Sequence, residues 1–167
     1  MKKLSCLFLS LFLISSIMMG CGKTEEGYEI LIKKLIAPET YASIKEDYPA
    51  EEYYEVLKKR FGEILNEEGF NSLAMPNVPI MYNDVINDKK ITAVKDLKIS
   101  DVKEDDKGDY TYVSCNVTYS YIIADGESID MKESFAFHVN KDDKIIENVW
   151  CDMKNNSIYK LRWTGKS

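Results

Sequence analysis

Apolar side chains recur at helical spacing in a segment that begins shortly after residue 24. Its apolar positions are three or four residues apart and form one continuous stripe: Tyr28, Leu31, Ile32, Leu35 and Ile36. This spacing predicts an amphipathic helix. Thr24 is a favourable residue for its N-terminal cap, and Pro38 is expected to end it.

A second helical stripe follows Pro49 and predicts a longer helix that reaches Gly69. Its buried positions are Tyr53, Tyr54, Leu57, Phe61, Ile64 and Leu65. We expect Gly69 to form a left-handed cap, with Phe70 packing back onto the helix. Residues 71–90 contain two prolines, and for them the sequence predicts only a short strand and a turn of helix.

From Ile91 onward the hydrophobic period changes to two, which is typical of strands. Strands are predicted near residues 93–103, 110–123, 131–139 and 144–153. Turns are predicted at 104–109, 125–126 and 140–143, where acidic residues, Asn and Gly gather. For the tail, residues 154–167, we expect a short strand or an irregular segment.

The alternation along residues 110–123 separates an apolar from a polar face. The odd positions are Val113, Cys115, Val117, Tyr119 and Tyr121, and most even positions are polar. Such a pattern indicates an antiparallel sheet that is covered on one side only. Because the predicted helices come first and the strands later, the fold class is α+β, with N-terminal helices packed on one face of a curved antiparallel sheet.

The N-terminal segment has a different pattern. Lys2 and Lys3 precede an apolar run over residues 4–19, and Gly20 and Cys21 follow directly. This arrangement resembles a bacterial lipoprotein signal peptide with its lipobox, although Met18 stands where the lipobox consensus has Leu. The resemblance implies that Cys21 is acylated and becomes the first residue of the mature chain.

The alternative is an uncleaved N-terminal membrane helix, but the run is shorter than the ~20 residues that span a bilayer. Both interpretations place the rest of the chain outside the cytoplasm. We therefore predict a signal peptide at 1–20, a lipidated cysteine and short tether at 21–26, and one α+β domain at 27–167. The lipid on Cys21 would attach this domain to the membrane.

Charge restricts the partners of this domain. The chain has a formal net charge of −6, which becomes −8 when Lys2 and Lys3 leave with the signal peptide. The sequence has no basic stripe of the kind that binds nucleic acid, so that function class is excluded. The acidic excess also disfavours direct contact between the domain and anionic lipid.

Two cysteines remain besides Cys21 once Cys6 leaves with the leader. Cys115 and Cys151 both fall on the apolar side of their strands. A meander of strands would leave one strand between them, so we expect two buried free thiols, with a disulfide as the alternative. The sequence has no Cys or His spacing typical of a metal site, and no cofactor is predicted. His138, the one histidine, is expected at the polar surface.

The order of elements over residues 24–153 resembles the cystatin-like folds, in particular the nuclear-transport-factor-two-like superfamily, although no specific motif carries this resemblance. It implies a cone-shaped sheet that can enclose a cavity. Members of the superfamily include enzymes, binding modules and assembly domains, so the resemblance informs the fold more than the function.

Glu133 and Glu147 interrupt the apolar side of their strands. If the sheet curls around a cavity, these carboxylates would line it together with Tyr119 and Tyr121, and burial would raise their pKa values enough for acid or base chemistry. The alternative, which we favour, is that each glutamate lies at a strand end or bulge and faces water.

Four large side chains occupy the otherwise polar face of the sheet: Tyr112, Ile122, Ile146 and Trp150. Exposed aromatic residues with polar neighbours are typical of a partner surface, unless the tail covers them. We therefore expect a non-enzymatic binding or assembly module of the cell envelope, with an envelope protein as its partner. A small-molecule-binding or enzymatic domain that uses the cavity is the alternative, and a structural envelope protein with a filled core is a third interpretation.

Overall fold

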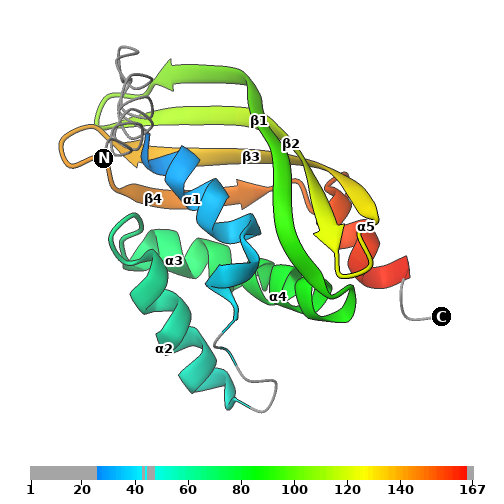
Figure 1. Ribbon diagram of the computed structural model, residues 1–167. Helices are drawn as coiled ribbons and strands as arrows, with labels where there is room; N and C mark the ends of the chain where they lie inside the picture. Colours follow the sequence, from blue (N-terminus) through cyan, green and yellow to red (C-terminus); the bar gives the residue numbers. More distant parts are fainter. Residues whose placement is uncertain (1–25, 43, 45–47, 165–167) are drawn as a thin grey trace, which may run out of the picture.

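The computed structural model describes residues 26–42, 44 and 48–164 (Figure 1). Cys21, the predicted signal peptide and most of the predicted tether lie outside the described residues. The helices are α1 (Gly27–Ile36), α2 (Ala50–Phe61), α3 (Glu67–Ala74), α4 (Val78–Asp88) and α5 (Ser157–Thr164), with one 3₁₀ turn at Pro38–Thr40. The strands are β1 (Ile91–Asp106), β2 (Tyr110–Ile123), β3 (Ser128–Asn140) and β4 (Ile146–Cys151). The predicted α+β class is confirmed.

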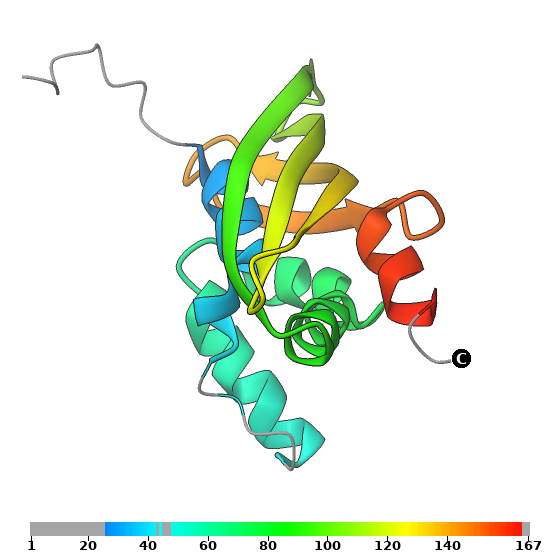
Figure 2. The same ribbon diagram turned by 45° about the vertical axis from the view of Figure 1, so that its right-hand side comes forward.

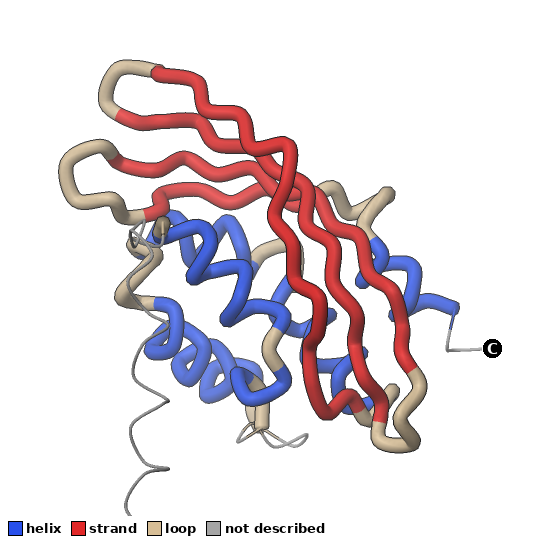
Figure 3. Tube along the Cα trace, turned by 45° about the horizontal axis from the view of Figure 1, so that its top comes forward, coloured by secondary structure: helices blue, strands red, loops and turns tan. Residues whose placement is uncertain are grey.

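The four strands form one antiparallel sheet in the order β1-β2-β3-β4. The sheet bends strongly, and helices α1, α3 and α4 lie within the bend (Figures 1 and 3). We call the sheet face toward these helices the inner face and the opposite one the outer face. Within the described ranges, every helix is too short or too polar to cross a bilayer.

The bend originates in β1, the edge strand. Its pairing with β2 shifts register three times, between Ile91 and Ala93, between Lys95 and Lys98, and between Ser100 and Lys103. At two of these shifts Asp96 and Asp101 adopt positive φ angles of 54° and 53°. Each extra residue is a bulge that turns the strand and increases its twist. The strand is therefore longer than predicted and does not keep a strict alternation of faces.

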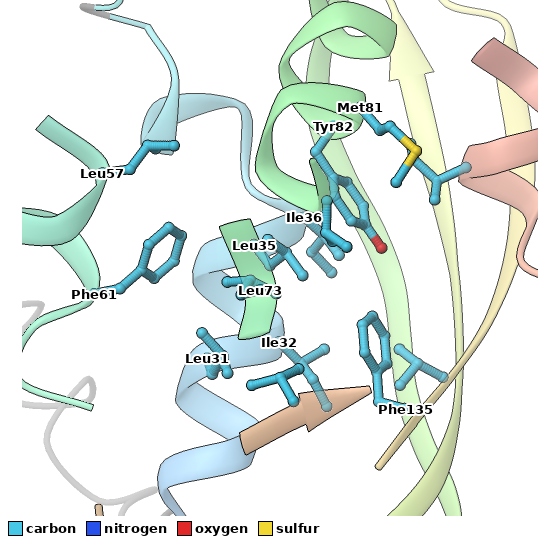
Figure 4. Close-up of a cluster of buried hydrophobic side chains, with 14 of the residues drawn as sticks. Leu31, Ile32, Leu35, Ile36, Leu57, Phe61, Leu73, Met81, Tyr82 and Phe135 are labelled. Carbon is cyan, nitrogen blue, oxygen red and sulfur yellow. The ribbon is translucent and has the colours of Figure 1, made fainter. Parts of the chain in front are cut away.

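Side chains fill the space between the helices and the inner face (Figure 4). The stripe predicted for the first helix is buried in α1, with Leu31, Ile32, Leu35 and Ile36 exposed by no more than 1%. Every odd position of β2 from Val113 to Tyr121 is likewise buried. The predicted alternation of β2 thus corresponds to an apolar inner face and a polar outer face.

The single long helix predicted over 49–69 is wrong, because the chain divides it into α2 and α3. The connection between them pairs with β4: the Ile146 N–H donates to the Ile64 carbonyl oxygen (2.9 Å), and the Asn66 N–H donates to the Ile146 carbonyl oxygen (3.3 Å). Ser72 Oγ in α3 accepts from the Val149 N–H (2.8 Å). These bonds satisfy backbone groups at the edge of β4 that a continuous helix would leave unpaired.

Gly69 is an interior residue of α3, not the predicted left-handed cap. A Cβ atom at this position would lie 2.2 Å from the Ile146 carbonyl oxygen. The absence of a side chain therefore permits α3 to approach the backbone of β4 closely.

Two further segments differ from the prediction. Residues 78–88 form helix α4, because Pro79 lies in its first turn, where the missing N–H is tolerated. Residues 157–164 form helix α5, which packs beside β3 and against α4 (Figure 2). Its first residue and the residue before it bind the part of β3 that extends past β4: the Lys132 N–H donates to Ser157 Oγ (2.9 Å), and the Ser134 N–H donates to Asn156 Oδ1 (2.8 Å).

Candidate functional site

The outer face carries four rings from three adjacent strands, which we call the aromatic row: Tyr110, Tyr112, His138 and Trp150. The His138 ring centroid lies 4.1 Å from that of Tyr110 and 4.3 Å from that of Trp150. The Tyr112 and Trp150 centroids are 6.4 Å apart. The rings therefore pack directly on one another, and Trp150, which is 42% exposed, offers the largest free surface.

His138 lies on the outer face as predicted, but it is half-buried within the aromatic row. Burial lowers its pKa below the usual value, while the negative charges of Glu147 and Glu68 act in the opposite direction. The imidazole is therefore mostly neutral at pH 7. Its role in the row is that of a ring between Tyr110 and Trp150.

Beside the aromatic row, three polar side chains connect β1, β2 and β3, and we call them the polar ladder. Asn116 Nδ2 donates to Asp101 Oδ2 (2.9 Å), and Ser134 Oγ donates to Asn116 Oδ1 (2.8 Å). The bond from Asn116 is the main reason why the pKa of Asp101 lies below its usual value. The bulge at Asp101 directs this carboxylate toward Asn116, which strict alternation along β1 would not predict.

A hollow of about 420 Å³ lies on the outer face between these two groups. Tyr112 and Trp150 form its aromatic side, and Asp101, Asn116 and Ser134 contribute the polar side. Lys103 and Asp152 are among its charged lining residues. We call this space the outer-face hollow; it combines ring surfaces with hydrogen-bonding groups that solvent can reach.

The structure places the four residues of the predicted partner surface differently from one another. Tyr112 and Trp150 line the outer-face hollow, and α5 leaves Trp150 exposed. Ile122 is half-buried near the far end of β2, opposite Ala93 and Ser128, and is not among the lining residues. The prediction for Ile146 is wrong, since this side chain is fully buried.

The reason for the error at Ile146 is a bulge. The register between β3 and β4 shifts between His138 and Val139, so that Ile146 pairs with Val139 while Asn148 pairs with His138. The additional residue, Glu147, reverses the face of every residue before it. A strict period of two cannot reveal this shift.

On the inner face, Glu133 is fully buried, contrary to the favoured expectation that it faces water. Its Oε1 accepts from the backbone N–H of Ile158 in the first turn of α5 (2.9 Å). Burial raises the pKa of Glu133 to about 8, although the Ile158 N–H and the charge of Lys160 oppose this shift. The carboxyl is therefore largely protonated at pH 7.

Tyrosines surround this carboxyl. The Tyr119 and Tyr121 rings meet edge to face at 5.0 Å, and the Tyr121 hydroxyl donates to the Ile36 carbonyl oxygen (3.0 Å). Within the described part of the chain, Glu133 Oε2 and the hydroxyls of Tyr82 and Tyr119 are buried and lack a hydrogen bond of normal geometry. Burial raises the pKa of Tyr119, and nearby Tyr121 and Glu133 raise it further.

Glu147 does not join this cluster. It is half-buried at the bulge of β4, and Asn140 Nδ2 donates to its Oε1 (2.9 Å). Ile146, its neighbour, pairs with Val139, which lies six residues along β3 from Glu133, or roughly 20 Å at the rise of a strand. The two glutamates therefore lie far apart, and the predicted bulge position applies to Glu147 alone.

Both remaining thiols are unpaired, as expected, but only Cys115 is fully buried and Cys151 is half-buried. Cys115 and Cys151 each pair with Phe135 from opposite sides, so that β3 separates them. Burial raises the pKa of the Cys115 thiol to about 11 and that of Cys151 further. Over the described ranges, no three His, Cys, Asp or Glu residues are arranged to hold a metal ion.

No protein-family model matches the chain, and no curated protein or solved structure is significantly similar to it. The functional argument therefore depends on the geometry of the two faces. The inner face buries a protonated glutamate among tyrosines, and the outer face presents an open hollow between rings and polar side chains.

Proposed function

We propose that this protein is a non-enzymatic binding module of the bacterial cell envelope. A lipid on Cys21 would tether it to the membrane outside the cytoplasm, and the outer face of its sheet would bind the partner. The leader pattern at residues 1–21 supports the tether. Within the α+β class, we further propose that the bent sheet with helices inside it is a cystatin-like cone.

The single observation that carries the binding role is the outer-face hollow. Its polar side chains and the exposed Trp150 face solvent, while the space under the inner face is filled by the protein's own side chains. Polar groups that converge beside aromatic rings are typical of a binding site. Glu133, the central residue of the alternative function, is enclosed beneath α5. This arrangement favours binding at the outer face over catalysis at the inner face.

Photo-crosslinking in living cells tests the binding role. A photoreactive phenylalanine at position 150 of the full chain should give light-dependent conjugates with an envelope component, and Tyr112→Ala should reduce them at least about fivefold. The same label at Trp163, which is 58% exposed on α5, is the matched control and should give few conjugates. Equal yields at positions 150 and 163 would contradict the proposal.

The tether needs a separate test. Wild-type protein should sediment with membranes and incorporate labelled fatty acid, whereas Cys21→Ala should do neither after the leader is removed. A Cys21→Ala protein that stays in the membrane fraction would favour the uncleaved N-terminal helix instead.

A further inference from the structure

We infer that the outer-face hollow binds a neutral carbohydrate chain, with one sugar ring stacked on Trp150 and sugar hydroxyls hydrogen-bonded to the polar ladder. The inference rests on the proposed function and names the chemical class of its ligand. It depends on the way the rings are packed, on the hydrogen-bonding capacity of the ladder and on the charge of the lining.

The packing of the aromatic row decides how a ligand can use it. An aromatic cage for an ammonium group needs rings that enclose the cation, each with its centroid within about 6 Å of it. Here the centroids of neighbouring rings are themselves only 4.1–6.4 Å apart, which leaves no space for a cation between them. A ligand must therefore lie on the exposed surface of the row, whose ring planes are inclined by 31–67° to one another and whose most exposed ring is Trp150. A pyranose with equatorial hydroxyls presents a flat C–H face that suits such a surface.

The polar ladder supplies the second half of sugar recognition. Asn116 and Ser100 both donate to Asp101 Oδ2, so that Oδ1 keeps its capacity to accept. Asn116 Nδ2 carries a second N–H that can donate. A side chain that accepts beside one that donates complements neighbouring sugar hydroxyls, because each hydroxyl does both. The ladder is fixed by its internal bonds, which reduces the entropy lost on binding.

The same groups disfavour other ligand classes. An apolar protein surface would bury the Asp101 carboxylate without providing donors, which is costly. A proline-rich segment presents carbonyl acceptors and few N–H groups, and so cannot satisfy a carboxylate. A polyanion would meet Asp101 and Asp152 with only Lys103 in the lining as a positive charge, on a chain of net charge −6. A neutral chain of hydroxyl-rich rings avoids all three conflicts.

The size and position of the hollow fit a segment of such a chain. Its volume of about 420 Å³ falls within the usual range of ligand sites. The hollow lies on the surface of the sheet and not inside the fold, so a longer polymer can continue beyond it. For a domain outside the cytoplasm, an extended glycan is a ligand that remains within reach.

Titration with defined sugars tests this inference on the full chain in detergent micelles. The chain contains two tryptophans, so Trp163→Phe leaves Trp150 as the only one that reports by fluorescence. The probes are cellohexaose and chitohexaose, with a proline-rich decapeptide as the competing class. We expect one of the sugars to shift the Trp150 emission and to bind with a Kd between about 10 µM and 1 mM by calorimetry.

Variants locate the binding. In the otherwise wild-type chain, Trp150→Ala should weaken calorimetric affinity at least about tenfold, and Trp150→Phe, which keeps a ring, should weaken it less. Asp101→Asn should weaken it about fivefold. Trp163→Ala is the matched control and should leave the Kd unchanged. Circular dichroism tests whether each variant is folded. If Trp150→Ala is not folded, Trp150→Phe replaces it in the comparison with wild type.

Either of two results with the sugars would overturn the inference. In the first, neither sugar binds at a concentration 10-fold above the expected upper Kd; in the second, any sugar that binds does so equally well to Trp150→Phe, Asp101→Asn and wild type. Binding of the decapeptide alone would also overturn it. If the sugars fail but crosslinking from position 150 still depends on Tyr112, the binding function stands and the ligand class is wrong. If crosslinking fails as well, both proposals are wrong.

Discussion

The two faces of the sheet place carboxylates in opposite electrostatic situations. On the inner face, Glu133 is fully buried, receives one backbone hydrogen bond and has a pKa raised to about 8. On the outer face, Asp101 is exposed, accepts from Asn116, and has a pKa below its usual value. The inner carboxyl is therefore mainly neutral at pH 7 and the outer one is ionised.

The difference shows how each face can be used. The neutral Glu133 carboxyl is enclosed by tyrosines and α5, and its Oε1 links β3 to α5 by accepting from the Ile158 N–H. An ionised carboxylate fixed beside an amide and next to a hollow keeps the capacity to bind a ligand. The inner face thus contributes mainly to stability, and the outer face carries the proposed recognition.

The strongest test of this division uses two neighbouring residues of β3. Phe137 points to the inner face and is fully buried, whereas His138 belongs to the aromatic row on the outer face. Phe137→Ala should lower the free energy of unfolding by about 3–5 kcal/mol, because it leaves a cavity in a packed core. His138→Ala should cost about 1 kcal/mol or less. Urea unfolding measures both, and equal losses would contradict the division.

The second test concerns the protonated state of Glu133. Between pH 4.5, the usual pKa, and about pH 8, the folded protein holds a proton at Glu133 that the unfolded chain has released. The stability contributed by this group should therefore fall as pH rises through that window, by roughly 5 kcal/mol in total, and remain constant above it. Glu133→Gln, which stays neutral at every pH, should not show this slope.

The measurement is the difference in unfolding free energy between wild type and Glu133→Gln from pH 4.5 to pH 9. Other titrating groups are common to both proteins and largely cancel in this difference. Glu147→Gln is the matched control, since Glu147 is only half-buried at the bulge. A difference that does not change with pH would mean that the Glu133 carboxyl is ionised in the folded state.

Sequence periodicity correctly predicts the helices and strands whose hydrophobic period is unbroken. The stripe of α1 and the alternation of β2 follow directly from the spacing of apolar residues, and the α+β class follows from their order. The same period predicts the outer-face positions of Tyr112 and Trp150, because it is unbroken along β2 and, in β4, from Asn148 onward.

Bulges and close backbone contacts are what the sequence does not reveal. The period of two puts Ile146 on the wrong face because the bulge at Glu147 shifts the register, and it does not indicate Asp101 because bulges in β1 redirect this side chain. Glu133 was expected to face water because its partner, the N–H of Ile158, belongs to a helix that the tail sequence did not indicate. The orientation of each of these three side chains depends on contacts between residues far apart in the chain, whereas the hydrophobic period depends only on local spacing.

The third test, a substitution of Gly69, should change the free energy of unfolding least, and it shows how closely helix α3 approaches the sheet. A Cβ atom at this position would lie 2.2 Å from the Ile146 carbonyl oxygen, so Gly69→Ala must displace α3 or β4. We expect a loss of about 2 kcal/mol in the free energy of unfolding, despite the higher helix propensity of alanine. Asn71→Ala, an exposed position of the same helix, should change stability by less than about 0.5 kcal/mol. If Gly69→Ala were neutral or stabilising, α3 would be able to move away from β4 without cost, and the inner layer would be less tightly packed than its burial indicates.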